Sequence, residues 1–287
     1  MKRDLLNIIE EHSKDFSKGQ RRIADYITEN YDKAAYMTAS RLGSLVDVSE
    51  STVVRFAIEL GFDGYPDMQR SMQEFVRTRL TSFQRIEVTN NLIGDGDLLE
   101  KVLSADIDKI KHTYEHIDRD SFNGAVNAII NAKRIYIIGV RSSSTLAGFL
   151  DYNFRMIFDD VRLVRNPSGS EMFEQIMNIN SDDVLIAISF PRYSTRIINA
   201  VEFAKNAGAN IIALTDTEKS PIAASANQLL LAQSDMVSFV DSLVAPLSIL
   251  NAIIVAVAKK KQDEVTDRLR RLEEIWDEYD VYDKSKS

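Results

Sequence analysis

Apolar residues recur every three or four positions through residues 1–80, the spacing that places side chains on one face of a helix. The residues that follow this spacing are Leu5, Ile8, Ile9, Ile23, Ala24, Ile27, Leu42, Leu45, Val46, Val53, Val54, Ala57 and Leu60. Because no alternating pattern interrupts them, we expect several short helices and no strand in this part of the chain.

The pattern changes beyond residue 97, where short apolar runs alternate with helical patterns. The expected strands are 134–138, 161–164, 184–189, 210–215 and 228–231. The expected helices are 97–116, 120–132, 143–158, 170–178, 194–207 and 239–258. Strands that are apolar at consecutive positions are buried on both faces, so this alternation predicts a parallel sheet between two helical layers, an α/β three-layer sandwich of the doubly wound type.

A polar stretch separates the two patterns. It runs from Thr81 to Gly96, and its end, NNLIGDG, has the composition of a linker. We therefore expect an all-α domain over residues 1–80, a linker over 81–96, and an α/β domain with a C-terminal helix over 97–287.

Composition narrows the possible functions. The chain has 287 residues, no cysteine and three histidines, which excludes disulfides and thiolate metal sites; we expect no metal and no cofactor. The net charge of −8 argues against a protein that coats nucleic acid along its whole surface. Residues 1–85 hold 13 basic and 13 acidic side chains, so a nucleic-acid contact is expected there and depends on the placement of a few cations.

The chain also lacks the signals of secretion and of membrane insertion. Its first residues have a basic start but too short an apolar run for a signal peptide, and no run approaches the roughly 20 apolar residues of a membrane span. We expect a cytoplasmic protein without membrane contact.

Two expected strands end in hydroxyl side chains and then enter helices. The first is followed by Ser142 and Ser143, and the third by Ser189 and Ser194, with Arg192 between them. Ligands of parallel sheets bind at the carboxyl ends of the strands. Backbone N–H groups at a helix start, serine hydroxyls and an arginine together suit a phosphate monoester, although single serines also serve as helix caps.

The sequences GVRSSSTLA and AISFPRYSTRI resemble the two ligand loops of the sugar isomerase (SIS) domain, a phosphosugar-binding fold, whose loops read G-x-G-x-S and S-x-S-G-x-T. ALTDTEKSPIA resembles the fourth strand of that family and the helix start after it. The resemblance covers residues 97–258 and implies a five-stranded parallel sheet in flavodoxin-like order.

The resemblance also implies roles for single residues. Gly139 matches the first glycine and Ser143 the serine of the first loop, while Ser189 and Ser194 match the first and last hydroxyl residues of the second loop. Ser142 is either a ligand contact or a helix cap.

This chain departs from the family pattern at three positions. Arg141 replaces the second glycine of the first loop, and Pro191 and Arg192 replace a serine and a glycine of the second. One hydroxyl is lost and cationic charge is gained, so we expect an arginine, Arg192 above all, to share in holding the phosphate.

The segment ASRLGSLVDVSESTVVRFAIELGF, residues 39–62, predicts a helix-turn-helix. Gly43 allows the two helices to approach, and Asp47 stands where a left-handed turn residue is expected. Ser49 is the expected N-cap of the second helix, and Gly61 lies just past its end.

The second of these helices is the expected reader of DNA. Its N-terminal part presents Ser49, Ser51, Thr52 and Arg55, where a recognition helix meets base edges and phosphates. An ordinary helical hairpin is the alternative.

The whole order resembles RpiR-type transcriptional regulators, whose DNA-binding hallmark is VS-x-x-TV-x-RF-x-x-x-LGF-x-G and whose C-terminal domain is a SIS domain. The resemblance covers residues 1–260. It implies a regulator that binds operator DNA, senses a phosphorylated sugar, and forms a homodimer or homotetramer; it implies no enzyme and no catalytic residue.

The alternative is an aldose-ketose phosphosugar isomerase with an N-terminal interaction module. Such an enzyme needs a positioned acid or base, for which Glu171 and Glu174 are the candidates. His112 and His116 lie four residues apart, but no third metal ligand accompanies them.

The C-terminal tail carries one further apolar stripe. Val265, Leu269, Leu272 and Trp276 share one face of an expected helix with charges elsewhere, a pattern typical of a helix that packs on its own domain or on a partner subunit.

Overall fold

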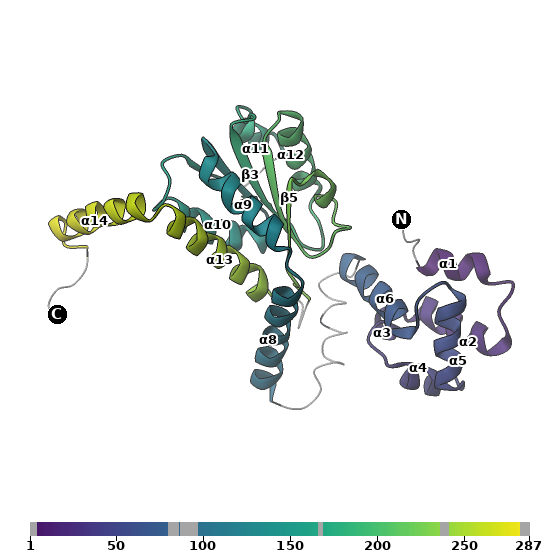
Figure 1. Ribbon diagram of the computed structural model, residues 1–287. Coiled ribbons are helices and arrows are strands. Elements are labelled where there is room, and N and C mark those ends of the chain that lie inside the picture. Colours follow the sequence, from purple (N-terminus) through teal and green to yellow (C-terminus); the bar gives the residue numbers. More distant parts are fainter. Residues whose placement is uncertain (1–4, 80–85, 87–96, 166–168, 236–240, 282–287) are drawn as a thin grey trace. The chain divides into compact units, whose positions relative to one another are not determined.

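Six helices make up the N-terminal part of the computed structural model, which describes residues 5–79, 86, 97–165, 169–235 and 241–281 (Figure 1). They are α1 (Leu5–His12), α2 (Lys18–Glu29), α3 (Tyr31–Ala34), α4 (Ala39–Leu45), α5 (Glu50–Glu59) and α6 (Tyr65–Arg79). The expected linker, 81–96, lies outside the described residues except for Ile86. The chain divides into two units, Met1–Lys101 with Met236–Asp241, and Val102–Asp235 with Ser242–Ser287.

The apolar spacing in the sequence becomes the core of the helical unit. Leu42, Val53 and Phe56 are completely buried there, and Met68 and Met72 of α6 pack into the same cluster. Helix ends are fixed by side chains: Ser17 caps α2 in a reciprocal capping box with Gln20. These helices therefore depend on one shared core and on caps rather than on length.

The second unit contains a five-stranded parallel sheet in the order β2-β1-β3-β4-β5. The strands are β1 (Arg134–Gly139), β2 (Val161–Val164), β3 (Asp183–Ile188), β4 (Asn210–Thr215) and β5 (Gln228–Leu231). The helices are α8 (Leu98–His116), α9 (Arg119–Asn131), α10 (Ser143–Phe154), α11 (Gly169–Ile176), α12 (Thr195–Asn206), α13 (Val244–Lys260) and α14 (Gln262–Glu278), with a 3-10 turn at Ala223–Ser225.

Helices cover both faces of the sheet (Figure 1). Along β1, Ile135 and Ile137 point into the cluster with α9, α10 and α13, whereas Tyr136 and Ile138 point into the cluster with α11 and α12. The prediction of a three-layer sandwich in flavodoxin-like order is confirmed.

Two helix boundaries differ from the sequence-based expectation by more than two residues. The helix expected over 239–258 begins at Val244 among the described residues, and Pro246 occupies its first turn, where a missing N–H costs no hydrogen bond. The helix expected over 143–158 ends at Phe154, where a tighter turn begins and Ile157 N–H bonds to the Phe154 carbonyl.

A buried ion pair joins the start of β1 to the start of β3. The Asp183 side chain is fully buried and accepts hydrogen bonds from Arg134 Nε at 2.8 Å and Nη2 at 2.7 Å. It also accepts one from the Asn180 backbone N–H at 2.9 Å. The side-chain bond to Asp183 raises the pKa of Arg134, whose positive charge is thereby stabilised.

We expect Asp183→Ala to lower the free energy of unfolding by about 3 kcal/mol, because it leaves a mostly buried guanidinium without its carboxylate. Urea unfolding followed by circular dichroism measures the loss. Asp182→Ala is the matched control: its side chain is exposed, and a change within about 0.5 kcal/mol is expected. Equal losses in the two variants would contradict the assignment.

Candidate functional site

The carboxyl ends of β1 and β3 lie side by side at the point where the strand order reverses. The two strands are hydrogen-bonded neighbours in parallel, with Gly139 opposite Ile188. From there α10 turns to one face of the sheet and α12 to the other. Such a reversal opens a crevice between two helix N-termini, the usual ligand position in sheets of this type.

The first junction depends on the absence of a side chain at Gly139. A Cβ there would lie 2.5 Å from the carbonyl oxygen of Ser143, so only glycine lets α10 begin this close to its strand. Arg141 adopts a left-handed conformation, with φ of 56°, and its side chain is exposed. The arginine that replaces the second family glycine therefore keeps the backbone conformation that glycine favours.

The second junction brings three of the expected residues into one loop. Ser189 is buried, with 4% of its surface exposed, and its N–H donates to the Leu214 carbonyl of β4 at 3.1 Å. Arg192 is exposed, and Ser194 is half-buried immediately before α12. The loop thus offers one hydroxyl at its base, one at the helix start and a cation at its surface.

The serines at the two helix starts do not cap their helices. Ser142 and Ser194 occupy the N-cap positions of α10 and α12, but neither side chain accepts a hydrogen bond from its helix. In the helical unit, by contrast, Ser17, Thr38 and Ser49 all accept such bonds. The capping alternative for Ser142 is therefore not observed, because its side chain accepts no hydrogen bond from α10.

A carboxylate at the end of β4 was missed by the sequence reasoning. Tyr193 Oη donates to Asp216 Oδ1 at 2.7 Å, and Thr215 Oγ1 donates to the same oxygen at 3.2 Å. The signal was available, because Asp216 directly follows a buried strand as the serines do. Its partner could not be read from the sequence, since 23 positions separate the two residues.

The residues considered for catalysis and metal binding lie on α11 and α8. Glu171 and Glu174 are exposed on α11. His112 and His116 stack on α8 with ring centroids 4.2 Å apart. Within the described residues, no group of three or more metal-ligating side chains forms.

The predicted helix-turn-helix is formed by α4 and α5. Asp47 adopts the expected left-handed conformation, with φ of 51°, and a Cβ on Gly43 would lie 2.8 Å from the Val48 carbonyl oxygen. Arg22 of α2, which the sequence did not single out, donates to Asp47 Oδ2 at 3.1 Å and to the Asp47 carbonyl at 2.8 Å. The turn is therefore held from a third helix.

Both ends of α5 are fixed as the sequence predicts. Ser49 accepts the Thr52 N–H at 3.3 Å, which confirms it as the N-cap. At the other end Gly61 has φ of 88°, and the Phe62 N–H reaches back to the Ala57 carbonyl at 3.1 Å, as in a Schellman motif.

The four candidate DNA contacts lie together at the start of α5. Ser49, Ser51 and Arg55 are exposed and Thr52 is half-buried. The Ser49 hydroxyl also bonds to the hydroxyls of Ser51 at 2.9 Å and Thr52 at 2.8 Å, and Arg55 Nε donates to the Ser51 carbonyl at 3.2 Å. The structure therefore presents one small polar surface there, with a single guanidinium beside three hydroxyls.

Family models match both parts of the chain. The model described as "Helix-turn-helix domain, rpiR family" matches residues 3–77, and the SIS domain model matches residues 128–256. The chain belongs to the rpiR family. It is a helix-turn-helix transcriptional regulator with a SIS domain.

Full-length relatives of this rpiR-family chain are also named as regulators. An uncharacterized HTH-type transcriptional regulator of Caldanaerobacter subterraneus is 24% identical over 281 residues, which is 95% of this chain and 96% of the relative. HexR of Escherichia coli, an HTH-type transcriptional regulator, is 22% identical and matches 94% of this chain and 93% of its own length. These relatives support a regulator over the isomerase alternative.

Solved structures share the fold of this rpiR-family chain. Vibrio vulnificus NanR, described in complex with ManNAc-6P, aligns over 95% of this chain and 97% of its own with a TM-score of 0.59 and 22% identity. The sugar isomerase domain of an RpiR transcription factor from Sphaerobacter thermophilus aligns over 62% and 99% with a TM-score of 0.59 and 23% identity.

We expect Gly139→Ala to lower the free energy of unfolding of the α/β unit by about 1–3 kcal/mol, because the added methyl presses on backbone rather than on a movable side chain. Gly148→Ala in α10 is the control, since a Cβ there meets nothing within 4 Å and alanine favours the helix. Chemical unfolding of both variants decides the matter: a Gly139→Ala protein as stable as the control would refute the close approach.

Proposed function

We propose that this regulator binds operator DNA through α5 and binds a phosphorylated sugar in the crevice at the ends of β1 and β3. The observation that carries the proposal is that the N-cap serines Ser142 and Ser194, which follow the neighbouring strands β1 and β3, do not cap their helices with their side chains. A hydroxyl released from capping beside a helix N-terminus is a donor for an anion.

The phosphate is proposed to lie between the two junctions. Ser143 and Ser194 donate hydroxyls to it, Ser189 supports the base of the loop, and Gly139 leaves room for the helix start. Arg192 is exposed at the rim, so it would reach the phosphate by rotating inward. Ser142 adds a further donor from the first loop.

The sugar itself is proposed to extend toward β4. The Asp216 carboxylate carries negative charge and repels phosphate, but it accepts hydrogen bonds from sugar hydroxyls as it does from Tyr193 and Thr215. Charge alone therefore orients the ligand, with the phosphate on the β1 side and the hydroxyls on the β4 side. The complex of NanR with ManNAc-6P supports a ligand of this class for this chain as well.

Operator binding is proposed to use the N-terminal part of α5. Ser49, Ser51, Thr52 and Arg55 provide hydroxyls and one guanidinium, the groups that contact phosphates and base edges in the major groove. Because helix-turn-helix proteins read two half-sites, we propose a homodimer or homotetramer, located in the cytoplasm with its operator.

Sugar binding should depend on the crevice serines and not on α5. We expect Ser143→Ala and Ser194→Ala each to weaken sugar-phosphate binding roughly 10-fold or more, because each removes a hydrogen bond to a charged group. Isothermal calorimetry with a panel of sugar phosphates measures the affinity, and mobility shifts without sugar should match those of the unmodified protein. Intact ligand affinity in both variants would refute the site.

Operator binding should show the reverse dependence. Arg55→Ala is expected to weaken operator binding by about 1–3 kcal/mol and to leave sugar-phosphate affinity unchanged. Arg41→Ala in α4 is a control on another exposed arginine outside the proposed contact set. Mobility-shift titrations of both variants test the assignment, which fails if Arg55→Ala binds operator as the control does.

A further inference from the structure

Helix α14 is amphipathic but buries none of its residues. Its apolar stripe consists of Val265, Leu269, Leu272 and Trp276 and continues to the C-cap residue Tyr279, at intervals of three and four. Leu269 is 38% exposed and Tyr279 is 70% exposed. A helix of 17 residues with such a stripe gains its stability from a packing surface, which its own unit supplies only in part.

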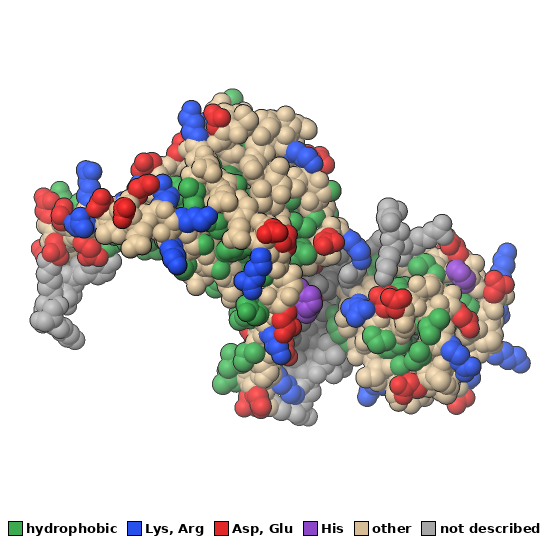
Figure 2. Space-filling view, viewed as in Figure 1, with side chains coloured by type: hydrophobic (Ala, Val, Ile, Leu, Met, Phe, Trp, Pro, Cys, Tyr) green, Lys and Arg blue, Asp and Glu red, His purple; other side chains and the backbone are tan. Residues whose placement is uncertain are grey.

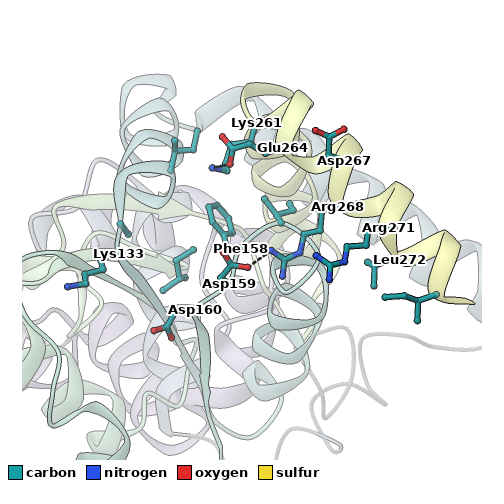
Figure 3. A pocket seen from close by; sticks show the side chains of 15 residues that line it. Lys133, Phe158, Asp159, Asp160, Lys261, Glu264, Asp267, Arg268, Arg271 and Leu272 are labelled. Atoms are coloured by element: carbon teal, nitrogen blue, oxygen red, sulfur yellow. Dashed lines mark hydrogen bonds and ion pairs between the residues drawn. The ribbon is translucent and has the colours of Figure 1, made fainter.

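An open cleft lies between α14 and the rest of its unit (Figure 3). The cleft has a volume of about 750 Å³ and separates Leu272 and Ile275 from Ile157 and Phe158 on the other wall. Arg268 bridges it by donating to Asp159 at 2.6 Å, and Val265 packs on the core at the first turn of the helix. Beyond that first turn the stripe is only partly covered by its own unit, since Leu269 and Tyr279 are exposed while Leu272 and Trp276 are half-buried.

A second apolar surface lies along α8, α9 and α13 of the same unit. It is a groove of about 550 Å³, and its exposed apolar side chains include Ile110 at 41%, Tyr114 at 67% and Val255 at 59%. Its charged lining residues are Arg119 and Lys259, both cations. Figure 2 shows that hydrophobic side chains reach the surface along α8.

The groove and α14 are complementary in charge, and each has an apolar surface. Residues 262–278 contain seven acidic side chains and three basic ones, a net charge of −4, and Figure 2 shows acidic side chains gathered there. The groove presents cations at its edge and apolar side chains inside. An amphipathic helix of this charge matches such a groove when its apolar stripe lies inside and its carboxylates lie beside Arg119 and Lys259.

The chain's own α14 cannot occupy the groove. The groove runs beside α13, and only Lys261 separates the end of α13 from the start of α14. Two helices that fold back on each other need a loop of about 2–5 residues. The α14 that fits the groove is therefore that of another molecule.

We propose that two copies of this chain exchange their C-terminal helices, each α14 lying in the α8/α9/α13 groove of the other copy. One helix and one groove per chain give two identical contacts about a twofold axis, a closed dimer. This inference rests on the homo-oligomer of the proposed function and specifies the surface through which its copies associate. It requires neither sugar nor DNA, so its test is separate from the tests of those ligands.

The first experiment breaks each half of the contact in the full chain. Leu269→Glu/Leu272→Glu places charge on the stripe, and Val255→Glu places it in the groove. Leu269 and Val255 are exposed and Leu272 is half-buried, so the fold should persist by circular dichroism. Light scattering coupled to gel filtration should show a dimer for the unmodified chain and at least a 100-fold weaker association for each variant. Arg270→Glu, on the polar face of α14, is the control and should remain dimeric.

The second experiment mixes the two variants. A pair made of one helix variant and one groove variant retains one intact contact, so heterodimers should form at concentrations where each variant alone is monomeric. A chain ending at Lys261 repeats the test if the double substitution lowers helix content.

Three outcomes would overturn the proposal. A helix variant that remains a dimer while the groove variant dissociates would assign the groove to self-packing of α8 and α13. Two variants that both remain dimeric would place the interface elsewhere or assign the groove to another segment of the same chain. Failure of the mixture to form heterodimers would exclude exchange.

Discussion

The parallel pairing of β1 with β3 places two strand-to-helix junctions next to each other, and the chemistry of the α/β unit depends on this pairing. Arg134 and Asp183 fix the register at the start of the two strands, where a buried carboxylate accepts three hydrogen bonds. Five residues later the same register places Gly139 opposite Ile188. The ion pair at the amino ends of β1 and β3 therefore positions the serines that follow their carboxyl ends.

The two junctions solve the same steric problem in different ways. At the first, Gly139 lets the backbone of α10 approach its strand, and Arg141 takes the left-handed conformation that a second glycine would otherwise provide. At the second, a longer loop separates Ser189 from Ser194, and Tyr193 anchors it to Asp216. Arg141 and Arg192 stand where the family pattern has glycine. The chain thus has less backbone freedom at these two positions and more positive charge at the rim of the crevice.

Most of the fold was predictable because the strands are buried on both faces. Runs such as Val184 to Ile188 are apolar at every position. The change to polar residues on either side therefore gives the ends of the strand to within one residue. The helix-turn-helix was predictable for a similar reason, since Asp47, Ser49 and Gly61 act on their immediate neighbours. Local signals of this kind do not depend on the tertiary fold.

The missed contacts all join residues that are distant in the sequence. Arg22 reaches Asp47 across 25 positions and Tyr193 reaches Asp216 across 23. The non-capping geometry of Ser142 and Ser194 was also beyond the sequence, because serine before a helix normally indicates a cap. The absence of a cap hydrogen bond at these serines becomes visible only when the helix starts are placed in the fold.

The layers of the α/β unit suggest how a ligand in the crevice could act on the proposed dimer. Helix α10 begins at the crevice and packs in the same layer as α13, and α13 continues through a single residue into α14. A phosphate that draws the start of α10 toward α12 acts on the helical layer that carries both the groove and the exchanged helix. A ligand shifts the equilibrium between two conformations only if it binds them with different affinity. This coupling therefore requires two packings of α10 against α13 that differ in the contact between the two copies. Only Lys261 connects α13 to α14. A rotation of α13 would therefore also move α14, which lies on the partner in the proposed dimer.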